Sequence, residues 1–463
     1  MKRKSKLSEY KRILERNELL FTMAEQGYKI CDTKQIAEQT TCYIFAPMVY
    51  CFTGWVLKRA QELGIRRLYF LSRDGWQFYH CAKELSREWN LSMECRYLEC
   101  SRYAMRIPCF GKMGDAALDF ICLGGVKVTF LSMMRRAGLN SEEAEEIAKA
   151  IGYQEEITAP LSYRKVLSFR ESLKNCVLFQ KRLTEISREA YPMAEGYLRQ
   201  EGLFEDIEYA IVDSGWTGTT QQTLQQLLNL GGYRKRIRGF YWGLYEIPKG
   251  TEAGDYYTYY FSPKGDYHKK VFFSNCLFEA VFSAPYGMVL SYCQRGESYI
   301  PIYERIQGSQ AEEMECQKNL IMNCVKQRKD KVCPEKSEEF LGYRQILYLL
   351  LKSFMGYPNK EEAEWYGNYQ FSDDVLEESQ QSIAAKLTEE ELKKHHVFHK
   401  MKYMFTKNTE ALPESAWYEA SAVLYGNNTW WHRKQYQWYK YLIYIRKNIK
   451  SKDSIKSLVQ NKK

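Results

Sequence analysis

Several features that define other protein classes are missing from this 463-residue sequence. Its 14 Cys are scattered, and no two of them have Cys-x-x-Cys spacing. This argues against a disulfide framework and against a zinc site built from such pairs. No secretory pattern follows Met1, so we expect a cytoplasmic protein whose thiols stay free in a reducing compartment.

A long uninterrupted hydrophobic run is also missing. The most apolar stretch, residues 42–57, contains Pro47 and Gly54 and is shorter than the roughly 20 residues that a membrane-spanning helix needs. We interpret it as a buried helix of a globular protein. Because single cores rarely grow beyond about 250–300 residues, the length predicts one large domain and a smaller one.

Acidic residues are scarce near the end of the chain. From His432 to Lys463 there are ten Lys and Arg against a single Asp, so this segment carries most of the net charge of +10. Within it, residues 430–447 (WWHRKQYQWYKYLIYIRK) mix cations with Trp and Tyr. Two interpretations remain open: a packed final helix with a solvated tail, or a segment 430–463 that lies on the anionic inner face of a membrane. No RNA-binding motif accompanies these residues, so nucleic acid is not an expected partner.

Short apolar runs alternate with segments of helical periodicity between residues 41 and 300, which predicts an α/β fold with a mainly parallel sheet. The strand candidates are 66–72, 94–101, 208–214 and 236–246. A helical lead-in is expected over 1–40, a helical insertion over about 115–205, and a helical C-terminal domain without strands over 301–463.

Two of the predicted strands run into polar strand-to-helix turns. Helical spacing of apolar residues resumes after Ser72-Arg73-Asp74-Gly75 and again after the turn Asp213–Thr220. In parallel sheets, ligands bind at the carboxyl ends of strands, where such loops enter helices. A third polar pair, Ser101-Arg102, follows the candidate strand 94–101.

The turn after the third candidate strand reads DSGWTGTT, in which small residues and hydroxyls precede a helix start. Backbone amides, hydroxyls and the helix dipole could there converge on a phosphate. The alternative is a tight turn made by Gly215 and Gly218, with Thr219 as a helix cap. Elsewhere, the guanidinium groups of Arg73 and Arg102 could pair with phosphate oxygens in a forked geometry, and Asp74 is a candidate ligand for Mg²⁺, directly or through water. The alternative for each of these three residues is a surface ion pair.

The candidate catalytic residues are Asp74, Asp213 and Glu279. The candidate phosphate- and substrate-binding residues are Ser72, Arg73, Gly75, Ser101, Arg102, Ser214, Gly215, Thr217, Gly218, Thr219 and Thr220.

Three segments, LYFLSRDGWQFYHCAKEL, YAIVDSGWTGTTQQTL and NCLFEAVFSAPYGMVLSY, resemble the C-terminal half of HAD-superfamily hydrolase-like proteins of bacterial surface-polysaccharide gene clusters. The resemblance covers roughly residues 40–295. It implies a phosphoribosyltransferase-like, Rossmann-like module, whose relatives pair it with a sugar-phosphate phosphatase. A HAD phosphatase needs an Asp-x-Asp pair, and none occurs in this sequence. We therefore expect a separate phosphatase, and no glycosyltransferase that holds its metal by that motif.

The resemblance also assigns residues. Asp213 resembles the second acid that follows the strand in phosphoribosyltransferases, Thr217–Thr220 resemble the loop that cradles the 5-phosphate, and Arg73-Asp74-Gly75 resemble the loop that receives the diphosphate. Val212 stands where the first acid is expected.

The implied activity is transfer from a phosphorylated sugar diphosphate, phosphoribosyl diphosphate, to a glycan or lipid-linked saccharide with the help of Mg²⁺. Asp213, Asp74 or Glu279 would act as the base. A noncatalytic module that binds a sugar phosphate or a partner enzyme, and a hydrolase of a similar donor, are the alternatives.

Overall fold

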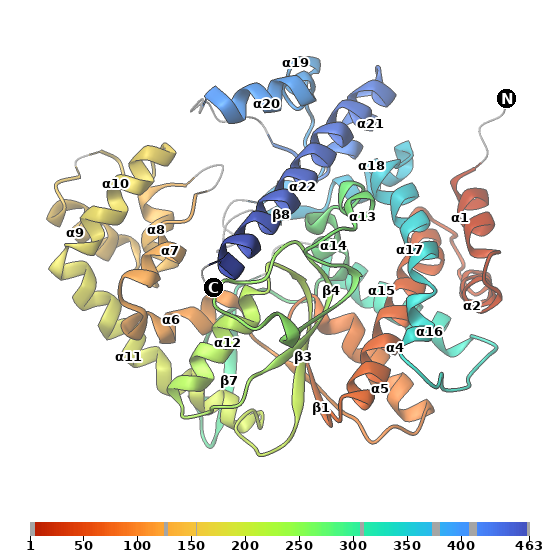
Figure 1. Cartoon of the computed structure of the whole chain (residues 1–463), viewed down its shortest axis with the longest axis horizontal. Helices are drawn as coiled ribbons and strands as arrows, with labels where there is room; N and C mark the ends of the chain where they lie inside the picture. Colours follow the sequence, from red (N-terminus) through yellow and green to blue (C-terminus); the bar gives the residue numbers. More distant parts are fainter. Residues whose placement is uncertain are drawn as a thin grey trace.

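The computed structural model describes residues 5–124, 128–153, 155–305, 310–372, 380–406 and 414–460. Its centre is a five-stranded parallel sheet of order β2-β1-β3-β4-β5 (Figure 1). The strands are β1 (Arg67–Leu71), β2 (Glu94–Leu98), β3 (Tyr209–Trp216), β4 (Arg238–Leu244) and β5 (Tyr256–Phe261). The predicted α/β class, the parallel sheet and the four strand candidates are confirmed. The fifth strand, YYTYYF, was not predicted.

Alternate strand residues face opposite layers of helices, as the pleat of a strand requires. On one face, Val212 and Trp242 pack with helices α4 (Ala46–Glu62), α5 (Gly75–Glu88) and α14 (Asn275–Phe282). On the other face, Ile211 packs with the second helical layer. That layer consists of α6 (Arg102–Met113), α11 (Val177–Gln200) and α12 (Thr219–Leu230). Asp213 has the same parity as Ile211 and therefore belongs to the α6 face.

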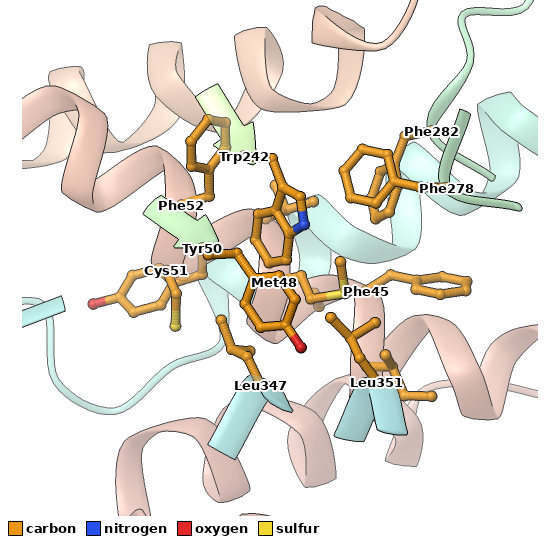
Figure 2. Close-up of a cluster of buried hydrophobic side chains, with 14 of the residues drawn as sticks. Phe45, Met48, Tyr50, Cys51, Phe52, Trp242, Phe278, Phe282, Leu347 and Leu351 are labelled. Atoms are coloured by element: carbon orange, nitrogen blue, oxygen red, sulfur yellow. The ribbon is translucent and has the colours of Figure 1, made fainter. Parts of the chain in front are cut away.

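The apolar stretch 42–57 lies in the core, as predicted. It runs through the π-helical turn η1 (Thr41–Phe45) into α4. Among the described residues, Ile36–Glu62 is the one helical segment long and apolar enough to cross a membrane, and its apolar window is entirely buried inside the protein. Figure 2 shows why: its side chains pack with Trp242 of β4 and with Leu347 and Leu351 of the C-terminal region.

The region 301–463 is not free of strands, so that prediction is wrong. A hairpin of β6 (Val289–Arg295) and β7 (Ser298–Tyr303) crosses residue 301, and a second short hairpin joins β8 (Gln370–Ser372) to β9 (Gln380–Ser382). Pro301 within β7 and the polar composition of β8 and β9 weaken the alternating pattern from which strands are predicted. Both hairpins lie outside the parallel sheet.

The other helices fall into three groups. The lead-in forms α1 (Lys6–Leu14), α2 (Glu18–Lys29) and α3 (Ile36–Thr40). The insertion adds η2 (Gly114–Ala117), α7 (Leu118–Ile121), α8 (Phe130–Arg136), α9 (Ser141–Ala150) and α10 (Tyr163–Lys174), which have a hydrophobic cluster of their own. The short helix η3 (Ala253–Asp255) directly precedes β5. After β5 come α13 (Tyr267–Val271), α15 (Gln310–Lys326), α16 (Glu338–Leu341), α17 (Arg344–Leu351), η4 (Lys352–Gly356), α18 (Lys360–Gly367), α19 (Glu389–Lys394), α20 (Val397–Thr406), α21 (Tyr418–Tyr425) and α22 (Thr429–Gln460). The lead-in, the sheet and the C-terminal helices share one hydrophobic core.

Candidate functional site

The carboxyl ends of β1, β2 and β3 lie side by side, because the three strands are parallel neighbours. Asp74 follows β1 and directly precedes α5, while Asp213 and Ser214 lie near the end of β3. Ser214 Oγ donates a hydrogen bond to Asp74 Oδ2. The two polar turns that the sequence indicated are therefore in direct contact. The peptide bond between Ser72 and Arg73 is cis.

A third carboxylate, Glu279, reaches this place from α14. Trp216, the last residue of β3, donates a hydrogen bond from Nε1 to Glu279 Oε1 at 2.6 Å. Burial first, and then the negative charge of Asp74, raise the pKa of Glu279 to about 8. The same two causes raise the pKa of Asp213 to about 7, although the Ser214 amide donates to its Oδ1 at 2.9 Å. Asp74, Asp213 and Glu279 thus form one crowded carboxylate cluster.

Two guanidinium groups act on this cluster. Arg102, the exposed first residue of α6, lowers the pKa of both Asp213 and Glu279 against the larger effect of burial. Arg73 does the same for Glu279. Three acids and two arginines from three strand ends and one helix therefore meet at one edge of the sheet.

Two serine hydroxyls that we predicted to bind the substrate form hydrogen bonds to backbone groups of this edge instead. Ser72 Oγ donates to the Cys100 carbonyl at 2.6 Å and accepts from the Cys100 amide at 2.9 Å, which ties the ends of β1 and β2 together. Ser101 Oγ accepts from the Ala104 amide at 2.9 Å, as the N-cap of α6, and donates to the Val289 carbonyl at 2.6 Å. We assign both serines to the framework of the site.

Glycine is required twice in the turn between β3 and α12. Gly215 has φ +115°, and a Cβ there would lie 2.3 Å from the Gly243 carbonyl oxygen. Gly218 has φ +64° and is the N-cap residue of α12, so the alternative in which Thr219 caps the helix is wrong. The left-handed conformation costs glycine little.

The hydroxyls of this turn lie on the same carboxyl edge. Thr217 Oγ1 and Thr219 Oγ1 are 3.2 Å apart and share a hydrogen bond. Thr219 and Thr220 form the first residues of the twelve-residue helix α12, whose free amides lie at this edge. Gly75 has the equivalent place at the start of α5, where a Cβ would approach the Phe70 carbonyl carbon to 3.1 Å.

Sequence reasoning missed Trp216 and Arg106. Arg106 lies one turn after Arg102 on α6, is 6% exposed, and stacks over the Phe120 ring at 4.0 Å. Its Nε is sealed from water without a hydrogen-bond partner in the described part of the chain. Burial, followed by repulsion from Arg102, lowers the pKa of Arg106 to about 9. The spacing Arg-x-x-x-Arg directly after the candidate strand 94–101 was the available signal.

The carboxylate cluster suits a magnesium ion that takes most of its ligands from substrate phosphates and water. The described residues contain no group of three or more His, Cys, Asp or Glu side chains placed to hold a metal alone. Mg²⁺ commonly takes one or two carboxylates and completes its octahedron with substrate phosphates and water. Asp74 fits that role, because a cation beside it would offset the negative charge that raises the pKa of Asp213 and of Glu279.

Fold and site together define a Rossmann-like α/β protein with acids and arginines gathered at the carboxyl edge of its sheet. No protein-family model matches this chain, and no curated protein matches it.

Proposed function

We propose that this protein is a phosphoribosyltransferase-type glycosyltransferase of bacterial surface-polysaccharide biosynthesis. It would transfer a ribofuranosyl 5-phosphate unit from phosphoribosyl diphosphate to a saccharide acceptor in the cytoplasm, and a separate phosphatase would remove the phosphate. The observation that carries the proposal is the contact between the turn after β1 and the turn after β3, through Ser214 and Asp74, with Glu279 fixed beside them by Trp216.

The donor is held by groups of both charges. Arg73 and Arg102 bind the diphosphate, and the amides and hydroxyls of Thr217–Thr220 bind the 5-phosphate. Asp213 accepts hydrogen bonds from the ribose hydroxyls. Bound Mg²⁺, held through Asp74, would neutralise charge on the diphosphate.

In the transfer step the bond between C1 of the ribose and the diphosphate oxygen breaks, and the diphosphate leaves with the electron pair. An acceptor hydroxyl oxygen forms the new bond to C1, and its proton passes to the carboxylate of Glu279. We assign the base role to Glu279 because it is more accessible than Asp213. The Trp216 indole orients its carboxylate through Oε1, and the second oxygen is the one assigned to accept the proton. With a pKa of about 8, it is matched to proton transfer near neutral pH.

Diphosphate release from phosphoribosyl diphosphate is the direct test. The purified chain is incubated with donor, Mg²⁺ and lipid-linked saccharides, and diphosphate and glycosylated product are measured. Acceptor-dependent release that Asp213→Asn abolishes would support the proposal. No release with any acceptor, or release that Asp213→Asn leaves unchanged, would contradict it, and release without an acceptor would identify a hydrolase.

A noncatalytic sugar-phosphate-binding module is the second candidate, and Val212 is the observation that favours it. The Val212 side chain is fully buried in the core, on the face of β3 opposite to Asp213, so no second acid at the strand end shares the ribose hydroxyls with Asp213. Calorimetry with phosphoribosyl diphosphate separates the candidates: heat of binding without turnover favours the module.

A further inference from the structure

Arg106 is a buried cation that has no counter-ion among the residues that the structure describes. It is more than nine-tenths buried, its Nε has no partner within these residues, and Arg102 is the charged group that perturbs its pKa. Burying an isolated charge is costly, and proteins normally pair such a group with an opposite charge. Arg136, which is equally buried at 6% exposure, donates to the Ile121 and Leu123 carbonyls. The isolation of Arg106 is therefore not a general property of arginines in this part of the fold.

The two arginines of α6 share one face of the helix. Residues four apart lie one above the other, about one turn along the axis. The charge of Arg102 acts on Asp213 and Glu279 in the carboxylate cluster. The Arg106 guanidinium lies over the Phe120 ring of α7. The pair thus extends the site from the sheet edge toward the helical insertion.

We propose that Arg102 and Arg106 together form a binding subsite for a phosphoryl dianion of the substrate. An anion between two guanidinium groups removes their mutual repulsion and gives the Arg106 donors an acceptor. The subsite rests on the proposed function only for the identity of the phosphorylated molecule. The unpartnered, buried Nε of Arg106 supports an anion site whatever the reaction is.

Arg106→Gln and the matched Arg136→Gln test this subsite without turnover. Calorimetry with inorganic pyrophosphate and, separately, with ribose 5-phosphate gives the affinity, and thermal unfolding gives the stability of each ligand-free variant. We expect Arg106→Gln to weaken binding of at least one probe about tenfold or more and to leave the ligand-free Tm equal or higher. Arg136→Gln should lower the Tm and leave affinity unchanged.

A structural role for Arg106 would give the opposite result, a lower Tm and unchanged affinity, and would overturn the proposal. So would the absence of binding of either probe to the unmodified protein. Binding that depends on Arg106, in a chain that releases no diphosphate, would contradict the proposed reaction and leave the subsite standing.

An independent feature is the reversed polarity of α22. Its inward face carries polar side chains: His432 and Gln437 are buried, and Lys440 Nζ donates to the Phe273 carbonyl at 3.2 Å. Its outward face carries apolar ones, spaced so that they form a single stripe along the helix. These are Trp431, Trp438, Leu442 and Ile445, each between 42% and 55% exposed.

The outward stripe, defined by these four residues, has a basic border. Arg446 and Lys447 are exposed beside it, and no Asp or Glu occurs between Glu419 and Asp453. Trp side chains beside cations suit the interface of an anionic bilayer. The same apolar side chains are not stabilised by contact with water. We infer that the outward stripe of α22 docks on an anionic membrane surface.

This docking would turn the candidate site toward the bilayer. Tyr444 on the inner side of α22 stacks on Tyr245, with ring centres 5.7 Å apart, and Tyr245 directly follows β4 at the carboxyl edge of the sheet. Figure 1 shows α22 running obliquely across the view above the strands. A lipid-linked acceptor could thus reach the edge from the membrane.

Vesicle sedimentation tests the membrane proposal independently of any activity. The chain is mixed with vesicles of phosphatidylcholine alone or of phosphatidylcholine with phosphatidylglycerol, at low and high salt. The test variant changes the four stripe residues to Gln, and the matched control changes four exposed apolar residues elsewhere to Gln. Those control positions are Ile30, Leu167, Val177 and Val332.

We expect salt-sensitive binding to the anionic vesicles only, reduced about tenfold or more in the stripe variant and unchanged in the control variant. Equal binding of both variants, no binding, or equal binding to neutral vesicles would overturn the inference. A dimer in vesicle-free solution that the stripe variant dissociates, measured by analytical ultracentrifugation, would overturn it too and would assign the stripe to a second copy of the chain.

Discussion

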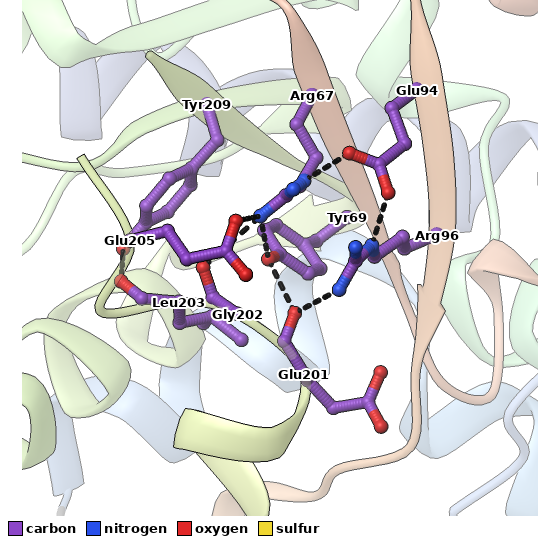
Figure 3. Close-up of polar contacts among 9 residues, drawn as sticks. All are labelled: Arg67, Tyr69, Glu94, Arg96, Glu201, Gly202, Leu203, Glu205 and Tyr209. Carbon is purple, nitrogen blue, oxygen red and sulfur yellow. Dashed lines mark hydrogen bonds and ion pairs between the residues drawn. The ribbon is translucent and has the colours of Figure 1, made fainter. Parts of the chain in front are cut away.

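The two edges of the parallel sheet differ in the partners that they give to a buried arginine. At the amino edge, Arg67 is 5% exposed and contacts Glu94, Glu205 at 2.8 Å, the Gly202 carbonyl at 3.1 Å and the Tyr69 hydroxyl (Figure 3). Burial alone would lower the pKa of Arg67, but these bonds raise it. At the carboxyl edge, Arg106 is equally buried, and the described part of the chain gives its Nε no such partner.

The carboxylates differ in the same way. Although burial opposes it, the pKa of Glu94 is lowered by Arg67 and Arg96, whereas burial and crowding raise the pKa of Asp213 and Glu279. Charges that are fully paired stabilise the fold. Charges that their neighbours do not balance, as for Asp213, Glu279 and Arg106, destabilise it, and they are typical of places where a ligand supplies the missing charge.

The largest effect we expect is on turnover at the carboxyl edge. Glu279→Gln removes the base and should lower the rate of transfer by roughly 10²- to 10⁴-fold, while stability stays equal or rises because one crowded acid is gone. The measurement is diphosphate release beside urea unfolding. Glu246→Gln, an exposed acid that follows β4 on the same edge, is the control and should retain full activity. A Glu279→Gln protein of normal activity would contradict the assignment.

The amino edge should respond in stability and not in binding. Arg67→Gln removes several charged hydrogen bonds from a buried position, so we expect a loss of about 2–3 kcal/mol in the free energy of unfolding. The exposed carboxylates of Glu94 and Glu205 can rehydrate, which limits the loss. Urea unfolding measures it, and pyrophosphate affinity should be unchanged. A similar loss in Arg106→Gln would erase the contrast between the two edges.

The fold was more predictable from the sequence than the site. The four strands and the buried helix 42–57 follow local apolar patterns, and the parallel order brings Ser72–Gly75, Ser101-Arg102 and Asp213–Thr220 to one edge by topology alone. Contacts made across the fold could not be predicted in that way. Trp216 acquires its role only because α14 places Glu279 next to it, and nothing local shows that Arg106 is buried without an acid.

The pH dependence of stability should have opposite signs at the two edges. Asp213 and Glu279 have raised pKa values, so the native state holds protons that the unfolded chain has released, and stability falls as the pH rises from about 4 toward 8. Relative to the unmodified chain, Asp213→Asn should therefore gain roughly 1–2 kcal/mol between pH 5 and pH 8. Glu94 has a lowered pKa. The stability that its ion pairs contribute is therefore lost as the pH falls below the pKa that Glu94 has in the unfolded chain. Urea unfolding between about pH 3 and pH 8 checks both, and parallel curves for Asp213→Asn and the unmodified chain would contradict the crowding.

The smallest effect we expect concerns how Glu279 is held. Trp216 adopts φ +70°, a backbone conformation that is unfavourable for a bulky residue, and its indole donates to Glu279 Oε1 at 2.6 Å. This hydrogen bond lowers the pKa of Glu279 against burial and the charge of Asp74. Trp216→Phe keeps the ring packing and removes the donor, so the pH–rate profile should shift to higher pH by up to about one unit, with a loss of about 1 kcal/mol or less in transition-state stabilisation at neutral pH. At pH values well above the shifted pKa the rate should recover, because the carboxylate is then fully ionised. A lower rate at every pH with an unshifted profile would show that Trp216 acts through packing alone, and that the proton acceptor is a different group.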